Sequence, residues 1–186
     1  MIDKIVALDV ETTGLSFDDD DPSTNHQILS IGLIVADGDF NPVDEYYAEI
    51  KWNGTSHWNN KAEEIHGLSR EYLEEHGKHE GEVATEITEF LLKYFDPEEK
   101  IIFLGHNVRS FDIYFFNKLM RKFDFYFRIA HRSIDSFSIG MALFGVSNSD
   151  ELFNMFYPKR KSHNALEDAS MSLGVCKQMR KLMESL

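Results

Sequence analysis

The first apolar run of the chain, residues 4–12, ends in acidic residues. Its continuous apolar stretch predicts a buried β-strand. Side chains two positions apart on a strand point to the same face, so Asp9 and Glu11 are expected to project together. Two neighbouring carboxylates repel each other, and a hard divalent cation such as Mg²⁺ or Mn²⁺ would relieve that repulsion. Taken alone, the pair fits a strand end with two solvated acids equally well.

Hydrophobic periodicity divides the rest of the chain into strands first and helices later. The first strand and two more, with short turns between them, predict an antiparallel meander. Beyond the meander, patterns of period 3.6 predict helices and short apolar runs predict parallel strands. Strands are expected over residues 28–35, 44–52, 101–104 and 127–134, and helices over residues 59–65, 69–75, 82–94, 111–123, 135–144, 149–157 and 162–186. This order of elements predicts a single α/β domain over residues 1–186.

Composition narrows the classes of function. Apolar residues make up 42% and charged residues 27% of the 186 residues, which is typical of a globular protein. The net charge of −13 argues against a general nucleic-acid binder, although it allows an enzyme that grips a few phosphates through metal ions. No apolar run approaches the roughly 18 residues that a membrane span needs, and no signal peptide is visible. The single cysteine, Cys176, is expected in the core of a reduced, cytoplasmic protein.

Two local charge clusters have plain explanations. The acidic loop at residues 18–23 lacks the glycine and the glutamate of a helix-loop-helix calcium site, so we expect a solvated loop. Basic residues gather at positions 121–122 and 159–161, where a solvated surface is the simplest expectation.

Two more acids and a histidine fall where strands end and helices begin. Asp112 opens a predicted helix directly after a buried strand, and Asp168 lies in the first two turns of the last helix. Ligands collect at such strand ends in open α/β sheets, although Asp112 alone would also fit a helix cap. Within one helix, His163 and Asp168 would point about 140° apart, so they converge only if His163 lies at the helix entrance. There His163 would be accessible to solvent, which suits a proton carrier.

Three segments resemble the motifs of the DEDDh (DnaQ-like) 3′→5′ exonucleases, a family that includes the proofreading epsilon subunit of bacterial DNA polymerase III. These segments are DVETTGL at residues 9–15, His106-Asn107 with Asp112, and HNALEDA at residues 163–169. Residues 62–69 and 133–136 further resemble the "IHGI" and "IDT" segments of the family. The resemblance extends from residue 4 to about residue 178. It implies an RNase H-like α/β fold, in which a five-stranded mixed sheet with an antiparallel second strand carries helices on both faces.

The resemblance also implies a mechanism, which is hydrolysis of a phosphodiester with two Mg²⁺ or Mn²⁺ ions as cofactors. Asp9 would bridge both ions. Glu11 and Asp168 would complete the ion that binds the attacking water, and Asp112 would hold the other ion. His163 would take the proton from that water, a role that suits histidine at neutral pH.

By the same resemblance, a second set of residues would hold the terminal nucleotide. Leu15 would wedge against the terminal base, and the backbone of Thr12 and Thr13 would meet the 3′-hydroxyl. His66 would contact the terminal nucleotide, and Asn107 would orient the second motif. Leu15 and His66 also fit a turn leucine and a helix-end histidine with no role in binding.

The chain departs from the family in two places. Lys61 stands where the family often has a glutamate, which puts the nearby nucleotide contact in doubt. Residues 144–157 lack the usual "SLDAL"-like helix that borders the substrate groove, so the groove is expected to be more open or differently shaped. Phe17 and Trp58 are further candidates for stacking on bases.

The leading hypothesis is an exonuclease that releases nucleoside 5′-monophosphates from single-stranded or frayed 3′ ends. DNA is favoured over RNA because the ETTGL sequence at residues 11–15 resembles that of proofreading and repair exonucleases more than that of oligoribonucleases. One alternative is a catalytically idle module that binds nucleic acid or a polymerase. Others are an RNA-directed exonuclease of the same family and a phosphatase for small nucleotides. All five catalytic positions are intact, which argues against the idle module. We expect nucleic acid with a free 3′ end as the partner, no membrane, and a stand-alone enzyme in preference to one bound to a polymerase or replication partner.

Overall fold

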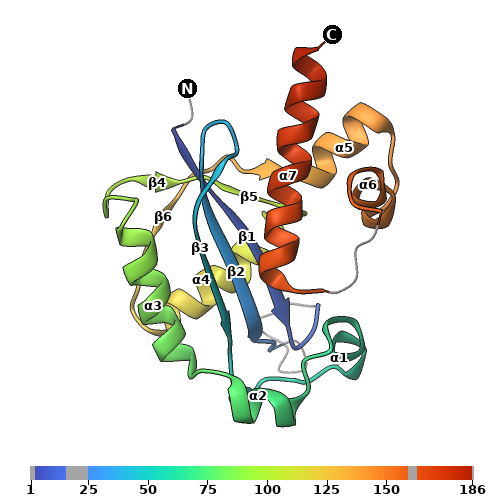
Figure 1. Cartoon of the computed structure of the whole chain (residues 1–186). Helices are drawn as coiled ribbons and strands as arrows, with labels where there is room; N and C mark the ends of the chain where they lie inside the picture. The colour runs from blue at the N-terminus through green and yellow to red at the C-terminus, as the bar shows by residue number, and fades with distance from the viewer. Residues whose placement is uncertain (1–2, 16–24, 159–162, 186) are drawn as a thin grey trace.

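A single mixed sheet organises the computed structural model, which describes residues 3–15, 25–158 and 163–185. Its strand order is β3-β2-β1-β5-β7 (Figure 1). β2 runs antiparallel to both of its neighbours, whereas β5 is parallel to β1 and to β7. The strands are β1 (Lys4–Thr12), β2 (Ile28–Asp37), β3 (Pro42–Glu49), β5 (Phe103–Gly105) and β7 (Ile134–Asp135). The predicted five-stranded sheet with an antiparallel second strand is therefore confirmed, and so is the meander that begins it.

Helices cover both faces of this sheet, as the RNase H-like fold requires (Figure 1). One face carries α3 (Glu80–Leu92) and α4 (Asp112–Lys122). The other carries the long α7 (Ala165–Glu184), beside which lie α5 (Ser136–Phe144) and α6 (Ser149–Phe156). Two short helices, α1 (Asn60–His66) and α2 (Arg70–His76), lie at the end of the sheet where β1 finishes (Figure 1).

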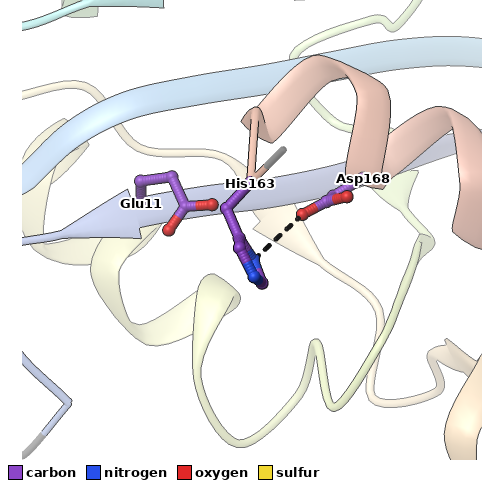
Figure 2. Close-up of side chains that lie close together, drawn as sticks. All are labelled: Glu11, His163 and Asp168. Carbon is purple, nitrogen blue, oxygen red and sulfur yellow. Dashed lines mark ion pairs between the residues drawn. The ribbon is translucent and has the colours of Figure 1, made fainter. Parts of the chain in front are cut away.

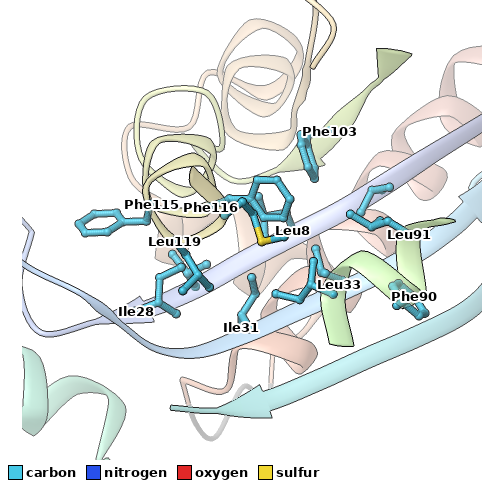
Figure 3. Packing of buried hydrophobic residues seen from close by; sticks show 14 of the residues in the cluster. Leu8, Ile28, Ile31, Leu33, Phe90, Leu91, Phe103, Phe115, Phe116 and Leu119 are labelled. Atoms are coloured by element: carbon cyan, nitrogen blue, oxygen red, sulfur yellow. The ribbon is translucent and has the colours of Figure 1, made fainter. Parts of the chain in front are cut away.

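The alternation of side chains along β1 explains where the acids point. Val6, Leu8 and Val10 belong to the core cluster between the sheet and the α3–α4 layer, part of which Figure 3 shows around Leu8. Ile5 and Ala7 belong to the cluster beneath α7. Because side chains two apart share a face, Asp9 and Glu11 continue the face of Ile5 and Ala7. Both acids are half-buried, at the point where the apolar cover of that face ends.

Two predicted strands are each divided in two, which the apolar pattern did not reveal. Residues 101–104 contain the end of β4 (Lys100–Ile101) and the start of β5, and residues 127–134 contain β6 (Arg128–Ile129) and the start of β7. β4 and β6 pair in a separate parallel two-stranded sheet, whereas β5 and β7 join the main sheet. The break depends on which strand lies alongside, a tertiary contact that a run of apolar residues does not encode.

Helix ends differ from the sequence prediction by a few residues because side-chain caps set them. Ser69 caps α2 as expected, and its side chain accepts the N–H of Tyr72. The last helix starts at residue 165, not residue 162, because the side chain of Asn164 accepts the N–H groups of Leu166 and Glu167. The predictions made for Phe17, the acidic loop at 18–23 and the basic cluster at 159–161 fall outside the described residues.

Two further sequence predictions concern membranes and the cysteine. Among residues 3–15, 25–158 and 163–185, none of the helices has the length and hydrophobicity needed to cross a membrane.

Cys176 is buried in the cluster beneath α7 as expected, and burial raises the pKa of its thiol to about 12. At neutral pH this cysteine is therefore a core side chain in its thiol form.

Candidate active site

The start of α7 rests directly on β2, opposite the first acid of β1. Asp9 pairs with Gly32 in the β1–β2 ladder. A Cβ atom on Gly32 would lie 2.5 Å from the backbone of Ala165 and Leu166, so only glycine allows the helix to approach this closely. This contact places the first turn of α7, and the residue just before its cap, beside the acidic end of β1.

Glu11, His163 and Asp168 meet at this point (Figure 2). One ligand atom from each lies within 4.8 Å of the others. Nδ1 of His163 lies 3.7 Å from Oδ2 of Asp168, with 43% of the His163 side chain exposed and 6% of the Asp168 side chain exposed. His163 comes immediately before the N-cap Asn164. It therefore lies at the helix entrance, the one position from which the sequence spacing allowed it to reach Asp168.

Asp112 approaches the same strand end from the opposite face of the sheet. It is the first residue of α4, it is buried, and its Oδ1 accepts the N–H of Val10 at 3.0 Å. Burial raises the pKa of Asp112 to about 8, and the negative charges of Glu11 and Asp135 add to this, while the hydrogen bond from Val10 opposes it. Asp112 is thus more than a helix cap, because its carboxyl group lies within electrostatic reach of Glu11.

This set of side chains fits a hard divalent cation. Carboxylate oxygens are the ligands that Mg²⁺ and Mn²⁺ prefer, and imidazole nitrogen is a ligand for Mn²⁺-like transition metals. Several carboxylates gathered at a strand end repel one another until a cation neutralises them. Asp9 and Asp112 lie outside the compact group of Glu11, His163 and Asp168, but they flank it along β1 and through Val10. The residues that would hold such ions are therefore Asp9, Glu11, Asp112 and Asp168.

The turn after β1 is held tightly by the rest of the fold. Oγ1 of Thr12 donates to the carbonyl of Gly14 at 2.7 Å. The N–H of Thr13 donates to Gln27, and its carbonyl accepts the N–H of Asn59. Both backbone groups of Thr13 therefore help to hold the turn, and its carbonyl oxygen retains a second lone pair that can accept another hydrogen bond. The contact expected between the backbone of Thr13 and a 3′-hydroxyl stays a prediction.

His66 lies within electrostatic reach of His163. It is half-buried at the end of α1, and its Nδ1 accepts the N–H of Leu68 at 3.0 Å. Burial lowers the pKa of His66, the charge of Glu63 and a hydrogen bond to the backbone of Thr12 oppose this, and the charge of His163 adds to the lowering. These interactions connect α1 to the turn and to His163. Lys61 is exposed in the first turn of the same helix.

An open pocket of about 410 Å³ lies beside the turn. Leu15, 70% exposed, forms part of its lining with Asn107 and Phe111. Asn107 adopts a positive φ of 59°, a conformation that asparagine tolerates better than most residues. Sequence reasoning missed Phe111, although an aromatic residue directly before Asp112 was a usable signal.

The divergent stretch at residues 144–157 contains the helix α6, which contacts one lining residue of this pocket. His106 is another lining residue, and its Nε2 lies 2.7 Å from Oγ of Ser149, the first residue of α6. Its Nδ1 lies 3.2 Å from Oγ of Ser136, the first residue of α5. The imidazole also lies against the ring of Phe153. Through His106, α6 is anchored beside the pocket, while the expectation of a more open or differently shaped groove stays a prediction.

Trp58 does not serve as a base-stacking residue. Its side chain is buried, 8% exposed, in a small cluster with Leu29 and Leu73. Its Nε1 donates to Glu63 at 2.8 Å, and the guanidinium of Arg70 lies over its ring. The ring of Trp58 is covered by Arg70 and its N–H is already hydrogen-bonded to Glu63. Trp58 therefore has a structural role in holding α1 and α2 against the sheet.

Comparison with a family model and with solved structures points to exonucleases in both cases. A family model described as exonuclease, that of RNase T, matches residues 6–176. Exonuclease I from Methylocaldum szegediense superposes with a TM-score of 0.74 at 20% identity, over 96% of this chain and 40% of that one. Exonuclease I from E. coli in complex with a dA16 oligonucleotide gives 0.75 at 16% identity, over 96% of this chain and 41% of that one. A zinc-bound form of the E. coli enzyme with single-stranded DNA gives 0.72 at 14% identity, with the same coverage.

These likenesses, all at low identity, concern the fold. The chain spans about two fifths of the length of the solved structures that it matches. None of the curated protein sequences compared with it matches this chain.

Proposed function

We propose that this chain, which belongs to the RNase T exonuclease family, is a metal-dependent 3′→5′ exonuclease that releases nucleoside 5′-monophosphates from single-stranded or frayed 3′ ends of DNA. The observation that carries the proposal is the meeting of Glu11, His163 and Asp168 at the end of β1. Glu11 comes from the first strand, whereas His163 and Asp168 come from the start of the last helix. Asp112, bonded to the same strand through Val10, adds a fourth charged group to the same place.

The choice of single-stranded DNA rests on the solved relatives. E. coli exonuclease I has been crystallised with dA16 and dT13 oligonucleotides. The net charge of −13 fits an enzyme that holds a few phosphates at its site better than one that binds along a duplex. An RNA strand remains the competing substrate, and the experiment below includes it.

The residues of the site divide the chemistry between them. Two Mg²⁺ or Mn²⁺ ions held by Asp9, Glu11, Asp112 and Asp168 would neutralise the charge that develops on the phosphoryl and leaving oxygens. His163 is solvent-accessible and takes the proton of the attacking water as general base. The carboxylate of Asp168, close to its Nδ1, stabilises the imidazolium that results.

The pocket beside the turn receives the terminal nucleotide. Leu15 and Phe111 supply apolar surface for the base, and Asn107 supplies a polar group of the same lining. The backbone of Thr12 and Thr13, in the turn just before Leu15, meets the 3′-hydroxyl. His66, which is hydrogen-bonded to the backbone of Thr12 and within electrostatic reach of His163, contacts the same nucleotide. Each role is a proposal for the bound state.

Domain organisation and location complete the proposal. Residues 1–186 act as one exonuclease domain, in keeping with a family match that covers most of them. The single, buried Cys176 suits a reducing compartment such as the cytoplasm. The expected resemblance to the polymerase epsilon subunit, and with it a polymerase partner, stays a prediction.

The direct test uses one oligonucleotide sequence labelled at either end. The protein is incubated with single-stranded DNA carrying a 5′ label or a 3′ label, in Mg²⁺, in Mn²⁺ and in EDTA. We expect a ladder of shortened products from the 5′-labelled strand, immediate release of labelled mononucleotide from the 3′-labelled strand, and no reaction in EDTA. Matched RNA and blunt duplex DNA are run in parallel.

The controls separate the alternatives. An Asp9→Asn variant must be inactive, which excludes a contaminating nuclease. Release of mononucleotide from the 5′ end, or turnover in EDTA, would contradict the proposal. Faster degradation of the RNA strand would favour an RNA-directed exonuclease of the same family. Binding without turnover would favour the catalytically idle module.

A further inference from the structure

A buried histidine lies directly behind the turn that carries Leu15. His26 is 2% exposed, on the short segment that leads into β2. Its Nδ1 lies 3.1 Å from Oγ1 of Thr13 and 3.1 Å from the carbonyl of His57. Because a carbonyl oxygen only accepts hydrogen bonds, the contact with His57 places the hydrogen on Nδ1. The imidazole thus joins the turn to the segment that precedes α1.

The ring also fills the space beneath Gly14. A Cβ atom on Gly14 would lie 2.1 Å from Cε1 of His26 and 2.5 Å from each ring nitrogen. Gly14 has no positive φ, so the requirement for glycine here is one of space and not of backbone conformation. The imidazole is therefore the surface on which this turn rests.

A network of hydrogen bonds extends this contact. Oγ1 of Thr13 accepts the N–H of Gln27 at 3.1 Å, in addition to its contact with His26. The side chain of Gln27 donates to the carbonyl of Lys51 and accepts the N–H of Asn53. Three segments that are distant in sequence, at residues 12–14, 25–27 and 51–59, are thereby held together behind the pocket.

The surroundings keep His26 neutral. Burial lowers its pKa, the hydrogen bond to the His57 carbonyl partly opposes this, and the charges of His57 and Lys118 add to the lowering. The Nζ of Lys118 also donates to the backbone carbonyl of His26 at 3.1 Å. A neutral ring with its hydrogen on Nδ1 satisfies the contacts described above.

We propose that His26 is a positioning residue, which holds the turn at residues 12–14 and thereby sets the place of Leu15 in the pocket for the terminal nucleotide. Leu15 follows Gly14 directly and exposes 70% of its surface, so its position depends on the turn more than on packing of its own side chain. The inference rests on the function proposed above. Loss of His26 should weaken substrate binding and leave the chemical step nearly intact.

The test separates KM from kcat on a single-stranded DNA oligonucleotide. His26→Ala should raise KM about fivefold to tenfold, in the range expected for one lost hydrogen bond and its packing, with kcat within about twofold of the original protein. His26→Asn keeps a donor near the position of Nδ1 and should recover part of the loss. His131→Ala removes an exposed histidine elsewhere and should change neither constant.

Each outcome decides the matter. A KM for His26→Ala within twofold of the original, or a fall in kcat with KM unchanged, would overturn the positioning role. If His26→Ala does not fold, Gly14→Ala carries the test under the same criteria, since its new Cβ displaces the same ring. An inactive unmodified protein would instead refute the proposed function, so the two failures are distinguishable.

Discussion

Ala165, the first residue of α7, lies against Gly32 of β2 with no room for a side chain between them. Gly32 is also the partner of Asp9 across the β1–β2 ladder. One close approach of helix to strand therefore brings His163 and Asp168 to the acids of β1. The site depends on this contact as much as on the acids themselves.

Gly32→Ala should push the start of α7 away from β2. Overpacking of this kind typically costs about 1–3 kcal/mol of stability, and the displaced His163 and Asp168 should lower kcat much further than that loss explains. Urea denaturation and steady-state turnover, measured on the same preparation, check both effects. Gly54→Ala is the control. It strains the backbone, because Gly54 has a φ of 78°, but its added Cβ would meet no atom within 4 Å and so would displace no neighbouring element. A Gly32→Ala protein with the kcat of the Gly54→Ala control would contradict the account.

His163→Ala should abolish most turnover and keep the fold. The loss of a general base typically costs about 10²–10⁴-fold in rate, whereas truncating a half-exposed side chain outside a helix should leave stability nearly unchanged. Titration calorimetry with Mn²⁺ should give an affinity close to that of the original protein. A Mn²⁺ affinity that falls together with kcat would make His163 a metal ligand instead of the proton acceptor.

Asp112 should make the metal-free protein less stable as the pH rises. Its pKa is about 8 in the folded protein against an ordinary value of 3.8, so between these values the folded state keeps a proton that the unfolded chain has released. The free energy of unfolding therefore falls from about pH 4 to about pH 8. Urea denaturation in EDTA at several pH values measures this slope.

Asp112→Asn should flatten that slope, because the amide oxygen can still accept the N–H of Val10 but carries no charge. Saturating Mg²⁺ should flatten it as well, since the cation stabilises the ionised carboxylate. Asp124→Asn, at an exposed acid just beyond the C-terminal end of α4, is the control. Equal slopes for Asp112→Asn and the original protein would refute the buried, proton-binding state of Asp112.

Much of this site was predictable because it follows short-range rules. The alternation from Ile5 and Ala7 to Asp9 and Glu11 is visible in sequence, since a strand repeats every two residues. The five-residue spacing of His163 and Asp168 limited His163 to the helix entrance, where the structure has it. The resemblance to the exonucleases supplied the order of the remaining motifs.

What sequence reasoning missed depends on contacts between distant segments. The hydrogen bond from Val10 to Asp112 requires that α4 start beneath the end of β1. The partners of the Thr13 backbone come from Gln27 and Asn59, which no local pattern connects to it. His26 carries no motif of its own and becomes informative only once its ring is found under the turn.

Leu15→Ala should weaken oligonucleotide binding without affecting the fold. Leu15 is 70% exposed, and substitutions at such positions usually change stability by less than about 0.5 kcal/mol. We expect a higher KM for the single-stranded oligonucleotide and a similar melting temperature. Val43→Ala removes a comparably exposed apolar residue from β3 and should change neither quantity. Identical KM values for the two variants would contradict the role of Leu15 in binding the terminal nucleotide.

The measurement that tests the central claim most directly is anomalous diffraction from crystals soaked in Mn²⁺. Residues far apart in the chain are proposed to hold hard divalent cations at one end of β1. We predict anomalous peaks in contact with carboxylate oxygens of Glu11 and Asp168, flanked by Asp9 and Asp112, with His163 at the edge of the site. Manganese bound elsewhere, with these carboxylates bare at saturating concentration, would contradict the account.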